Sequence, residues 1–218
     1  FEMSKIFFGE LDLPDPLVNL GVGSGTHAFQ TGKMIIGLEQ TIVKLKPDLV
    51  LVPGDTNSTL ACALAAVKLK VPVAHVEAGA RSYDMRMPEE INRRLTDHCS
   101  SLLFAPTKNC AKNLRGEGIP KQLIKLSGDT MYDALLQHMP IASKSNILKK
   151  LGLKNEEYAV LTLHRPENVD TAKTLQKIMR AMTMLKELII VFPVHPRAKQ
   201  RLATVKLLKQ KEARDHIK

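Results

Sequence analysis

Short, mainly apolar runs alternate with helical patterns along the first part of the chain. Turn or helix-start residues follow each run, which is typical of strands buried on both faces of a sheet. The runs lie at residues 48–52, 72–76, 102–105 and 123–126. The helical patterns that come after them lie at residues 57–70, 88–99, 107–114 and 129–139. Strands and helices in this order predict a parallel α/β sheet built from βαβ units.

A second set of elements follows a polar, lysine-rich stretch that begins near Pro140. Two apolar runs with a helical pattern between them predict a strand, a helix and a strand. These elements lie at residues 158–163, 171–186 and 188–194. We therefore expect two domains, at residues 1–142 and 143–218.

Both predicted domains lack elements of a usual α/β fold. Helical patterns at residues 1–11 and 28–46 open the chain, whereas a doubly wound domain normally opens with a strand. The second domain has two predicted strands, fewer than the five or six of a usual sheet. We expect the N-terminal domain to lack its first strand and the C-terminal domain to be incomplete.

The composition is that of an ordinary globular protein. Of the 218 residues, 44% are hydrophobic and 25% are charged, which argues against a disordered or collagen-like chain. The longest apolar runs are far shorter than the ~20 residues of a membrane helix. The first residues lack the layout of a secretory signal, so we expect a cytoplasmic protein. Cys62, Cys99 and Cys110 have no CxxC spacing, which predicts neither a disulfide framework nor a structural zinc site.

The net charge of +10 is concentrated near the end of the sequence. Residues 196–218 contain eight basic and two acidic side chains, so they account for +6 of this charge. The remaining chain has too little positive charge for a nucleic-acid groove. Aromatic residues, which stack on bases, make up only 4% of the sequence, and Trp is absent. Nucleic-acid binding is therefore the weakest functional hypothesis.

Acidic residues follow two neighbouring predicted strands and open the next helix. Asp55 comes just after the strand at 48–52, and Glu77 directly follows the strand at 72–76. Parallel sheets bind ligands at this edge, where a carboxylate can act as a base or contact a sugar. Glu89 and Glu90 lie in the first turn of the following helix. Such a cluster would raise the pKa values of its members, which suits proton transfer near neutral pH.

Simpler interpretations exist for the individual acids. Asp55 is also a favoured residue type for capping the helix that follows it. Glu89 and Glu90 are also suited to compensating the positive end of a helix. Because capping explains Glu77 less well, the convergence of the acidic segments is more informative than any one of them.

Two histidines end predicted strands of the second domain. His164 is either a solvated loop residue or, in a cleft, a cation that meets a diphosphate or protonates a leaving group. His195 is interpreted as structural support. The glycines at 21–25 lack phosphate-loop spacing and predict a mobile loop. His75 and Glu77 form an HxE pair without further zinc ligands, so no metal site is expected.

Six motifs occur in a characteristic order and spacing. They are GDT at 54–56, HVEAGARS at 75–82, PEEINR at 88–93, GDT at 128–130, HRPEN at 164–168 and PVHP at 193–196. With these motifs, the sequence resembles the non-hydrolysing UDP-N-acetylglucosamine 2-epimerases from its start to about Pro196. Hydrolysing relatives tend to have Arg where this chain has Thr56, and Gly-Gly-Glu in the segment that matches residues 75–79, so the resemblance is to the non-hydrolysing branch.

This resemblance implies a fold and an activity. The family has two Rossmann-like domains that face each other across a cleft, as in the GT-B class of glycosyltransferases. It interconverts UDP-N-acetylglucosamine and UDP-N-acetylmannosamine, without cofactor or metal, by anti elimination of UDP to 2-acetamidoglucal and re-addition. The resemblance further implies a UDP-sugar as partner, a homodimer, and no nucleic acid or membrane as partners.

The resemblance also assigns functional residues. Family positions that matter for catalysis match Asp55, Glu77, Glu89 and His164. The three acids would act as acid/base groups or sugar contacts, with Asp55 and Glu77 also binding substrate. His164 would bind the diphosphate and help UDP to leave. The resemblance does not determine which carboxylate removes the C2 proton.

Two family segments do not occur in this sequence. They are a Gly-Thr-Arg-Pro-Glu segment near the start and a later Asp-Ser-Gly-Gly stretch, so we expect a chain truncated at both ends. Two alternatives therefore stay open beside the epimerase hypothesis. One is an epimerase for a related UDP-sugar such as a diacetamido uronate, and the other is an inactive fragment that acts as an interaction module.

Overall fold

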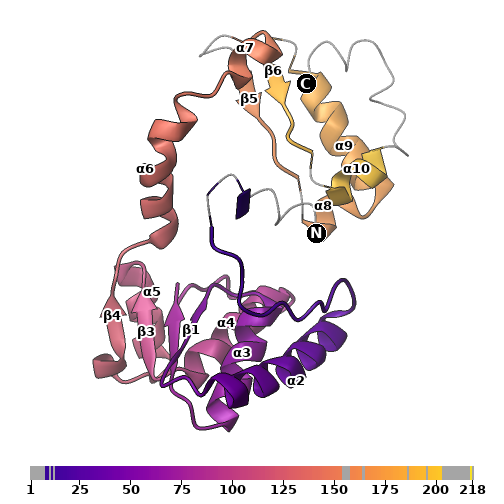
Figure 1. The fold of residues 1–218 in the computed structure, drawn as a ribbon. Coiled ribbons are helices and arrows are strands. Elements are labelled where there is room, and N and C mark those ends of the chain that lie inside the picture. The colour runs from indigo at the N-terminus through magenta and orange to yellow at the C-terminus, as the bar shows by residue number, and fades with distance from the viewer. Residues whose placement is uncertain are drawn as a thin grey trace. The chain divides into compact units, whose positions relative to one another are not determined.

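The computed structural model describes residues 8, 9, 11, 13–153, 158–163, 165–185, 187–194, 196–202 and 217. The chain divides into two compact units, Phe1–Gln137 (unit 1) and His138–Lys218 (unit 2), which are described separately (Figure 1). The division lies within helix α6, Thr130–Ala142, and the predicted domain boundary at 142/143 coincides with the end of this helix. No described helix is long and apolar enough to cross a membrane. Most of the predicted helix at 1–11 lies outside the described residues.

Unit 1 contains a four-stranded parallel sheet in the order β1-β2-β3-β4 (Figure 1). The strands are β1 (Val50–Pro53), β2 (Val73–Val76), β3 (Leu102–Ala105) and β4 (Ile124–Leu126). The four strands predicted for this region are thus confirmed. Pro53 is opposite Val76, and Val76 is opposite Phe104, so the strands end level with one another. Residues that follow these strands therefore emerge at one edge of the sheet.

The helices of unit 1 begin where the sequence supplies a suitable first residue. The threonine side chains of Thr26, Thr56 and Thr107 each accept a hydrogen bond from a backbone N–H in the first turn. Pro88 occupies a first-turn position that needs no amide donor. The helices are α2 (His27–Leu45), α3 (Asn57–Lys68), α4 (Pro88–Cys99) and α5 (Lys108–Gly116), with a short 3₁₀ turn, η1 (Lys121–Leu123), before β4.

Two apolar clusters hold these helices on the sheet. Small alanines of α3 pack with Ile42 of α2 and with Val52 and Val73 of the strands. Leu103 of β3 and Leu114 of α5 form the centre of the second cluster. All of these side chains are buried, so their removal from water contributes about 25 cal/mol per Å² to the stability of unit 1.

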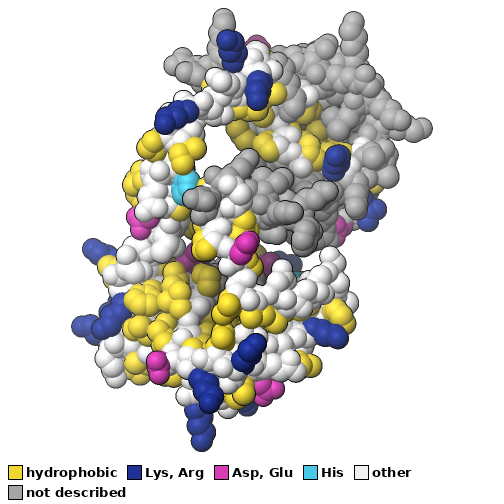
Figure 2. All heavy atoms as spheres, viewed as in Figure 1, with side chains coloured by type: hydrophobic (Ala, Val, Ile, Leu, Met, Phe, Trp, Pro, Cys, Tyr) yellow, Lys and Arg dark blue, Asp and Glu magenta, His cyan; other side chains and the backbone are white. Residues whose placement is uncertain are grey.

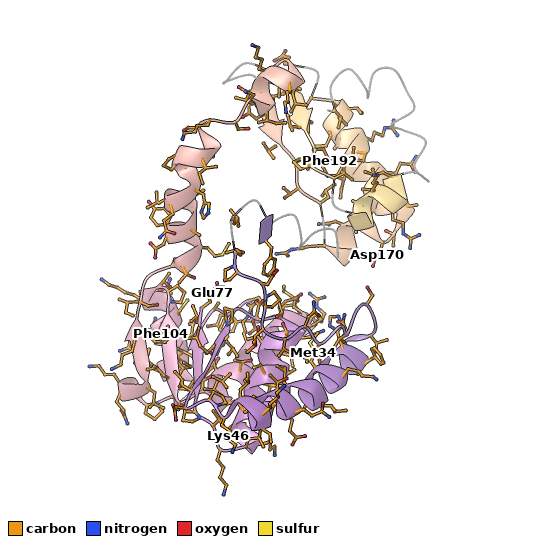
Figure 3. The ribbon with its side chains drawn as sticks, in the orientation of Figure 1. Met34, Lys46, Glu77, Phe104, Asp170 and Phe192 are labelled. Carbon is orange, nitrogen blue, oxygen red and sulfur yellow. The ribbon has the colours of Figure 1, made fainter. Side chains whose placement is uncertain are left out.

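β1 is the edge strand of the described sheet and borders an apolar groove of about 580 Å³. The groove is lined by the glycine-containing segment at 19–23, by Leu51 of β1 and by Met34 of α2. Figure 3 labels Met34. Figure 2 shows hydrophobic side chains gathered on the face of unit 1 where the strands lie. None of the acids expected to take part in catalysis lines this groove.

Unit 2 contains a two-stranded parallel sheet of β5 (Tyr158–Val160) and β6 (Ile189–Val191). Both strands are shorter than the predicted runs at 158–163 and 188–194, because pairing ends at Val160 and Val191. Leu175 and Met179 of α9 pack with Phe192, which directly follows β6. The helices of unit 2 are α7 (Ile147–Leu151), α8 (Pro166–Val169), α9 (Ala172–Thr183) and α10 (Pro196–Leu202).

Candidate active site at the strand ends

Asp55 lies in the turn between β1 and α3. Gly54 adopts a left-handed conformation (φ 66°), and its N–H donates to the carbonyl of Val76 at 3.1 Å. The Asp55 carboxylate accepts a hydrogen bond of 2.6 Å from Arg93. Thr56, and not Asp55, caps α3. The alternative interpretation of Asp55 as a helix cap is therefore wrong, and its side chain, 36% exposed, is held at the edge of the sheet.

Glu77, labelled in Figure 3, directly follows β2 at the edge of the sheet where the turn after β1 also lies. A Cβ atom added to Gly54 would lie 4.0 Å from Glu77 Oε2. Glu77 adopts φ 70°, a conformation that costs a residue with a side chain about 1–2 kcal/mol. Burial raises the pKa of Glu77, and the negative charges of Asp129 and Asp55 raise it further, against an opposing effect of His75. The structure thus brings Asp55 and Glu77 together in a strained, electrostatically coupled pair.

The neighbouring acids Glu89 and Glu90 have opposite environments. Glu89 is exposed in the first turn of α4 and forms no hydrogen bond or ion pair with the described residues. Glu90 is fully buried. Its carboxylate accepts hydrogen bonds from the N–H and hydroxyl of Ser82, at 2.8 and 3.0 Å, and from Arg94 at 2.8 Å. Glu89 is therefore free to meet a ligand, whereas Glu90 holds the loop at 80–87 on α4.

The expected mutual raising of pKa values holds for Glu77 but is wrong for Glu90. Burial raises the pKa of Glu90, but the hydrogen bonds from Ser82 and Arg94 and the positive charge of Arg93 outweigh it and bring the pKa to about 2. Glu90 is therefore a permanent carboxylate near neutral pH and is not a proton carrier.

Arg93 joins the two acid environments and was not assigned a role from the sequence. Its guanidinium lies 2.6 Å from Asp55 Oδ2 and 3.2 Å from Glu90 Oε2. Its Nε is buried and has no hydrogen-bond partner among the described residues. The spacing of Glu90 and Arg93, three residues apart on one helix, is the signal that could have indicated this ion pair.

A buried polar network lies beneath the acids. Asp97 accepts hydrogen bonds from His75 at 2.7 Å and from the N–H of Gly79 at 3.1 Å, and it pairs with Arg81 at 2.7 Å. Arg81 also pairs with Glu117 at 2.7 Å. His75 of the HxE pair is thus a member of this network, whereas Glu77 forms no hydrogen bond or ion pair with its described members. Within the described part of the chain, no group of three or more His, Cys, Asp or Glu side chains is suited to hold a metal ion.

His164 and His195 lie outside the described residues. The expectation that His164 binds a diphosphate therefore stays a prediction. The described candidate site consists of Asp55 and Glu77 at the strand ends, the exposed Glu89 at the start of α4, and the arginine that holds Asp55 in place.

Comparisons with known proteins identify the family. A sequence model described as UDP-N-acetylglucosamine 2-epimerase matches residues 1–217. A UDP-N-acetylglucosamine 2-epimerase homolog of Methanococcus maripaludis is 49% identical over 220 residues, which cover 100% of this chain and 61% of that protein. A UDP-2,3-diacetamido-2,3-dideoxy-D-glucuronate 2-epimerase of Pseudomonas aeruginosa is 46% identical over 202 residues, covering 90% of this chain and 56% of that protein.

A solved structure agrees with the sequence match. The crystal structure of Methanocaldococcus jannaschii UDP-GlcNAc 2-epimerase, in complex with UDP-GlcNAc and UDP, superposes with a TM-score of 0.88 at 49% identity. The match covers 99% of this chain and 60% of that one. The chain therefore spans about 60% of the length of these relatives. Sequence and structure together show that the chain belongs to the UDP-N-acetylglucosamine 2-epimerase family.

Proposed function

We propose that Asp55 and Glu77 are catalytic acids of an epimerase that interconverts UDP-N-acetylglucosamine and UDP-N-acetylmannosamine. The observation that supports this proposal is the closeness of Glu77 to the Asp55 turn at the ends of adjacent parallel strands. Burial and neighbouring negative charge raise the pKa of Glu77, so this carboxyl group holds a proton more readily than an ordinary glutamate, which suits it to accept and return one. Glu77 is therefore the described acid best suited to exchange a proton with the sugar.

The proposed reaction has two balanced halves. A carboxylate removes the C2 proton, the C2–H electron pair forms the C1=C2 double bond of 2-acetamidoglucal, and the C1–O bond breaks with its electron pair on UDP. UDP then adds back to C1 while C2 receives a proton on the opposite face. Because the C2 proton is acidified only weakly by its neighbours, a pre-positioned base and a stabilised leaving group contribute most of the catalysis.

The remaining roles follow from the family resemblance and from the exposure of the residues. Glu89 is exposed at the start of α4, so it is available as the second acid or as a sugar contact. His164 would stabilise the diphosphate as UDP departs. In this proposal the complete site lies in a cleft between two Rossmann-like domains arranged as in GT-B proteins, the enzyme is a homodimer, and neither cofactor nor metal takes part.

A related sugar is the second candidate substrate. The Pseudomonas aeruginosa relative that is 46% identical acts, by its name, on UDP-2,3-diacetamido-2,3-dideoxy-D-glucuronate. The two substrates share the UDP group and the acetamido group at C2, where the chemistry occurs. They differ at C3 and C6, so discrimination between them depends on groups outside the acid pair described above.

The test is C2 hydrogen exchange in D₂O, followed by NMR with each UDP-sugar in turn. The chain should catalyse the incorporation of deuterium at C2 of UDP-N-acetylglucosamine and the formation of UDP-N-acetylmannosamine. Asp55→Asn and Glu77→Gln should each lower exchange by about 100-fold or more, in the range typical of lost general acid–base catalysis.

The matched control is Glu39→Gln, which neutralises an exposed acid on α2 outside the site. This variant should exchange at the rate of the unsubstituted chain. Faster exchange on the diacetamido uronate would assign the chain to the second substrate. If neither sugar exchanged its C2 hydrogen and calorimetry detected no UDP binding, the proposal that this chain is catalytic would be wrong. The interaction-module hypothesis would then remain.

A further inference from the structure

His75 is buried in the middle of the sheet and both of its ring nitrogens are occupied. Its side chain, on β2, has no exposed surface. Nδ1 lies 2.7 Å from Asp97 Oδ1, and Nε2 lies 2.8 Å from the backbone carbonyl oxygen of Gly54. A substrate therefore cannot reach the ring, so any role of His75 in catalysis acts through the residues that it binds.

The chemistry of these two partners determines the protonation of the ring. A carbonyl oxygen has no hydrogen to donate, and a carboxylate only accepts. A neutral imidazole carries a single N–H, which would leave one of the two short contacts without a hydrogen. With Asp97 as a carboxylate, both contacts are hydrogen bonds only when both nitrogens carry hydrogen, as in an imidazolium cation.

The charges around the ring agree with this state. Arg81 and Asp97 are fully buried, and Glu117, which pairs with Arg81, is 22% exposed. Asp97 pairs with both the ring and Arg81, and Glu117 also lies near Arg94 and His98. An imidazolium beside the Asp97 carboxylate forms a paired buried charge, which avoids the cost of an unpaired buried ion.

The network connects the two loops that carry the acids. Gly54, whose carbonyl binds His75, directly precedes Asp55. Gly79, whose N–H binds the same Asp97 carboxylate, lies two residues after Glu77. The ring of His75 is thus the link between the Asp55 turn and Asp97, which in turn holds the segment after Glu77.

We propose that His75 is a positioning residue which, as a buried imidazolium, links the Gly54 carbonyl to the Asp97 carboxylate and so fixes the spacing of Asp55 and Glu77. Its importance for catalysis rests on the proposed function of these two acids. The bridge from the Gly54 carbonyl through His75 to Asp97 is independent of that function and is tested separately.

The first test is ¹⁵N NMR of the chain labelled in its histidine rings, near neutral pH, with His75 assigned by its contacts to Gly54 and Asp97. An imidazolium gives two protonated ring nitrogens with similar shifts and two slowly exchanging N–H protons. A neutral ring gives one protonated nitrogen and one far downfield. The neutral pattern would overturn the proposal. Because the measurement uses the unsubstituted chain, it does not depend on whether any variant folds.

The second test separates the two ends of the bridge. In His75→Asn, the amide nitrogen can replace Nδ1 and bind Asp97, but the Gly54 carbonyl is released, so the amide ¹⁵N shift of Asp55 should change and that of Gly79 should not. In His75→Gln, the amide nitrogen can replace Nε2 and bind Gly54, so the pattern should reverse. Equal changes at both loops, or none, would show a residue that only fills space.

His98→Gln is the matched control. His98 is half-exposed on α4 and lies 3.4 Å from Glu117, so it touches the edge of the same network without forming the bridge. Neither the Asp55 nor the Gly79 amide should change in this variant. A change as large as that in the His75 variants would contradict the assignment of the bridge to His75.

Kinetics then connect the bridge to catalysis. If the unsubstituted chain exchanges the C2 proton, both His75 variants should lower kcat about tenfold or more and change KM less, since the acids move while the contacts to the UDP group remain. Unchanged kcat would remove the positioning role. If the unsubstituted chain shows no exchange, the proposed function fails, while the ring and amide measurements still decide whether the bridge exists.

Discussion

Arg93 Nη2 lies 2.6 Å from Asp55 Oδ2, which ties the helix α4 to the turn that follows β1. The same guanidinium reaches Glu90 Oε2 at 3.2 Å, so one side chain contacts an acid of the candidate site and a buried acid on its own helix. The planar, forked geometry of arginine makes both contacts possible at once. Asp55 is therefore held in position from a helix that begins 33 residues later in the chain.

The first prediction concerns this double contact. Arg93→Lys keeps the positive charge, but a single ammonium group cannot reach both carboxylates in the arginine geometry. We expect a loss of about 1–2 kcal/mol in the free energy of unfolding and a decrease of about tenfold or more in C2 exchange. Urea denaturation and the D₂O assay measure the two effects.

Arg86→Lys is the control for this substitution. Arg86 is 91% exposed and pairs with Asp84 in the loop before α4, so the same change should leave both stability and exchange nearly unaltered. If Arg93→Lys behaved like Arg86→Lys, the tether to Asp55 would have no functional importance.

Glu89 and Glu90 provide the second prediction, because neighbouring identical residues should respond in opposite ways. Glu90→Gln removes a buried carboxylate that holds Ser82, Arg93 and Arg94, so it should cost about 3 kcal/mol of stability. Glu89→Gln changes an exposed side chain, so stability should stay within about 0.5 kcal/mol while C2 exchange falls by orders of magnitude. Near-normal turnover of Glu89→Gln would remove Glu89 from the mechanism.

The cost of Glu90→Gln should also depend on pH. The folded-state pKa of Glu90 is about 2, below the ordinary value of about 4.3, so the folded state binds this proton less readily than the unfolded state. Its contribution to stability is therefore fully present above about pH 4.3 and is lost as the pH falls toward 2. The stability difference between the unsubstituted chain and Glu90→Gln should narrow over this range, and a constant difference would contradict the assignment.

The sequence predicts the parallel sheet of unit 1 well because each strand and helix has a strong local signal. Runs such as the one at 72–76 are apolar and end at a turn, and Thr56 or Pro88 is a favourable residue for beginning a helix. The meeting of Asp55 and Glu77 follows from the level ends of adjacent parallel strands. These features depend only on short segments of sequence and on the rule that adjacent parallel strands end at the same edge of a sheet.

The roles of individual polar residues depend on distant contacts and were not predictable in the same way. Glu89 and Glu90 are chemically identical, and only the folded structure shows that Glu90 is the buried one and that it binds Ser82. Arg93 gains its role from Asp55, 38 residues away. In the sequence, His75 stands out only as half of an incomplete metal motif, because the Gly54 carbonyl that it binds is a backbone atom without any sequence signature.

The third prediction concerns the protonation of Glu77. Burial is the largest cause of its raised pKa, and Asp129, at the start of α6, is the next. Asp129→Asn should therefore lower the pKa of Glu77 toward the ordinary glutamate value, as measured by titration of its carboxyl ¹³C resonance. Asp133→Asn, one turn further along α6, is the control and should leave the Glu77 titration unchanged.

The raised pKa of Glu77 has a stability consequence of opposite sign to that of Glu90. The folded state holds the Glu77 proton more tightly than the unfolded state, so this residue lowers stability as the pH rises from its unfolded pKa through its folded pKa. Glu77→Gln cannot ionise and should gain stability relative to the unsubstituted chain over this rise. A relative loss would show that the ionised carboxylate is stabilised in the fold, contrary to its surroundings.

The fourth prediction concerns Gly79, two residues after Glu77, where the backbone lies close to helix α5. Gly79 has φ 82°, and a Cβ atom there would meet the Cys110 carbonyl oxygen and lie 2.8 Å from the Leu114 side chain. Gly118 has a similar φ of 85°, but a Cβ atom there would meet no described atom within 4 Å. Gly79→Ala and Gly118→Ala therefore share the backbone strain, and only the first adds a steric conflict.

Gly118→Ala should cost about 1–2 kcal/mol, as expected for a left-handed alanine, and Gly79→Ala should cost about 3 kcal/mol or more. Urea denaturation of both variants measures the difference. The Gly79 N–H binds Asp97 and its carbonyl binds Asn113, so displacement of this residue should also shift Glu77 and lower C2 exchange, whereas Gly118→Ala should not. Equal stability losses would mean that α5 moves away at little cost, and that the position of Glu77 does not depend on the close packing of Gly79.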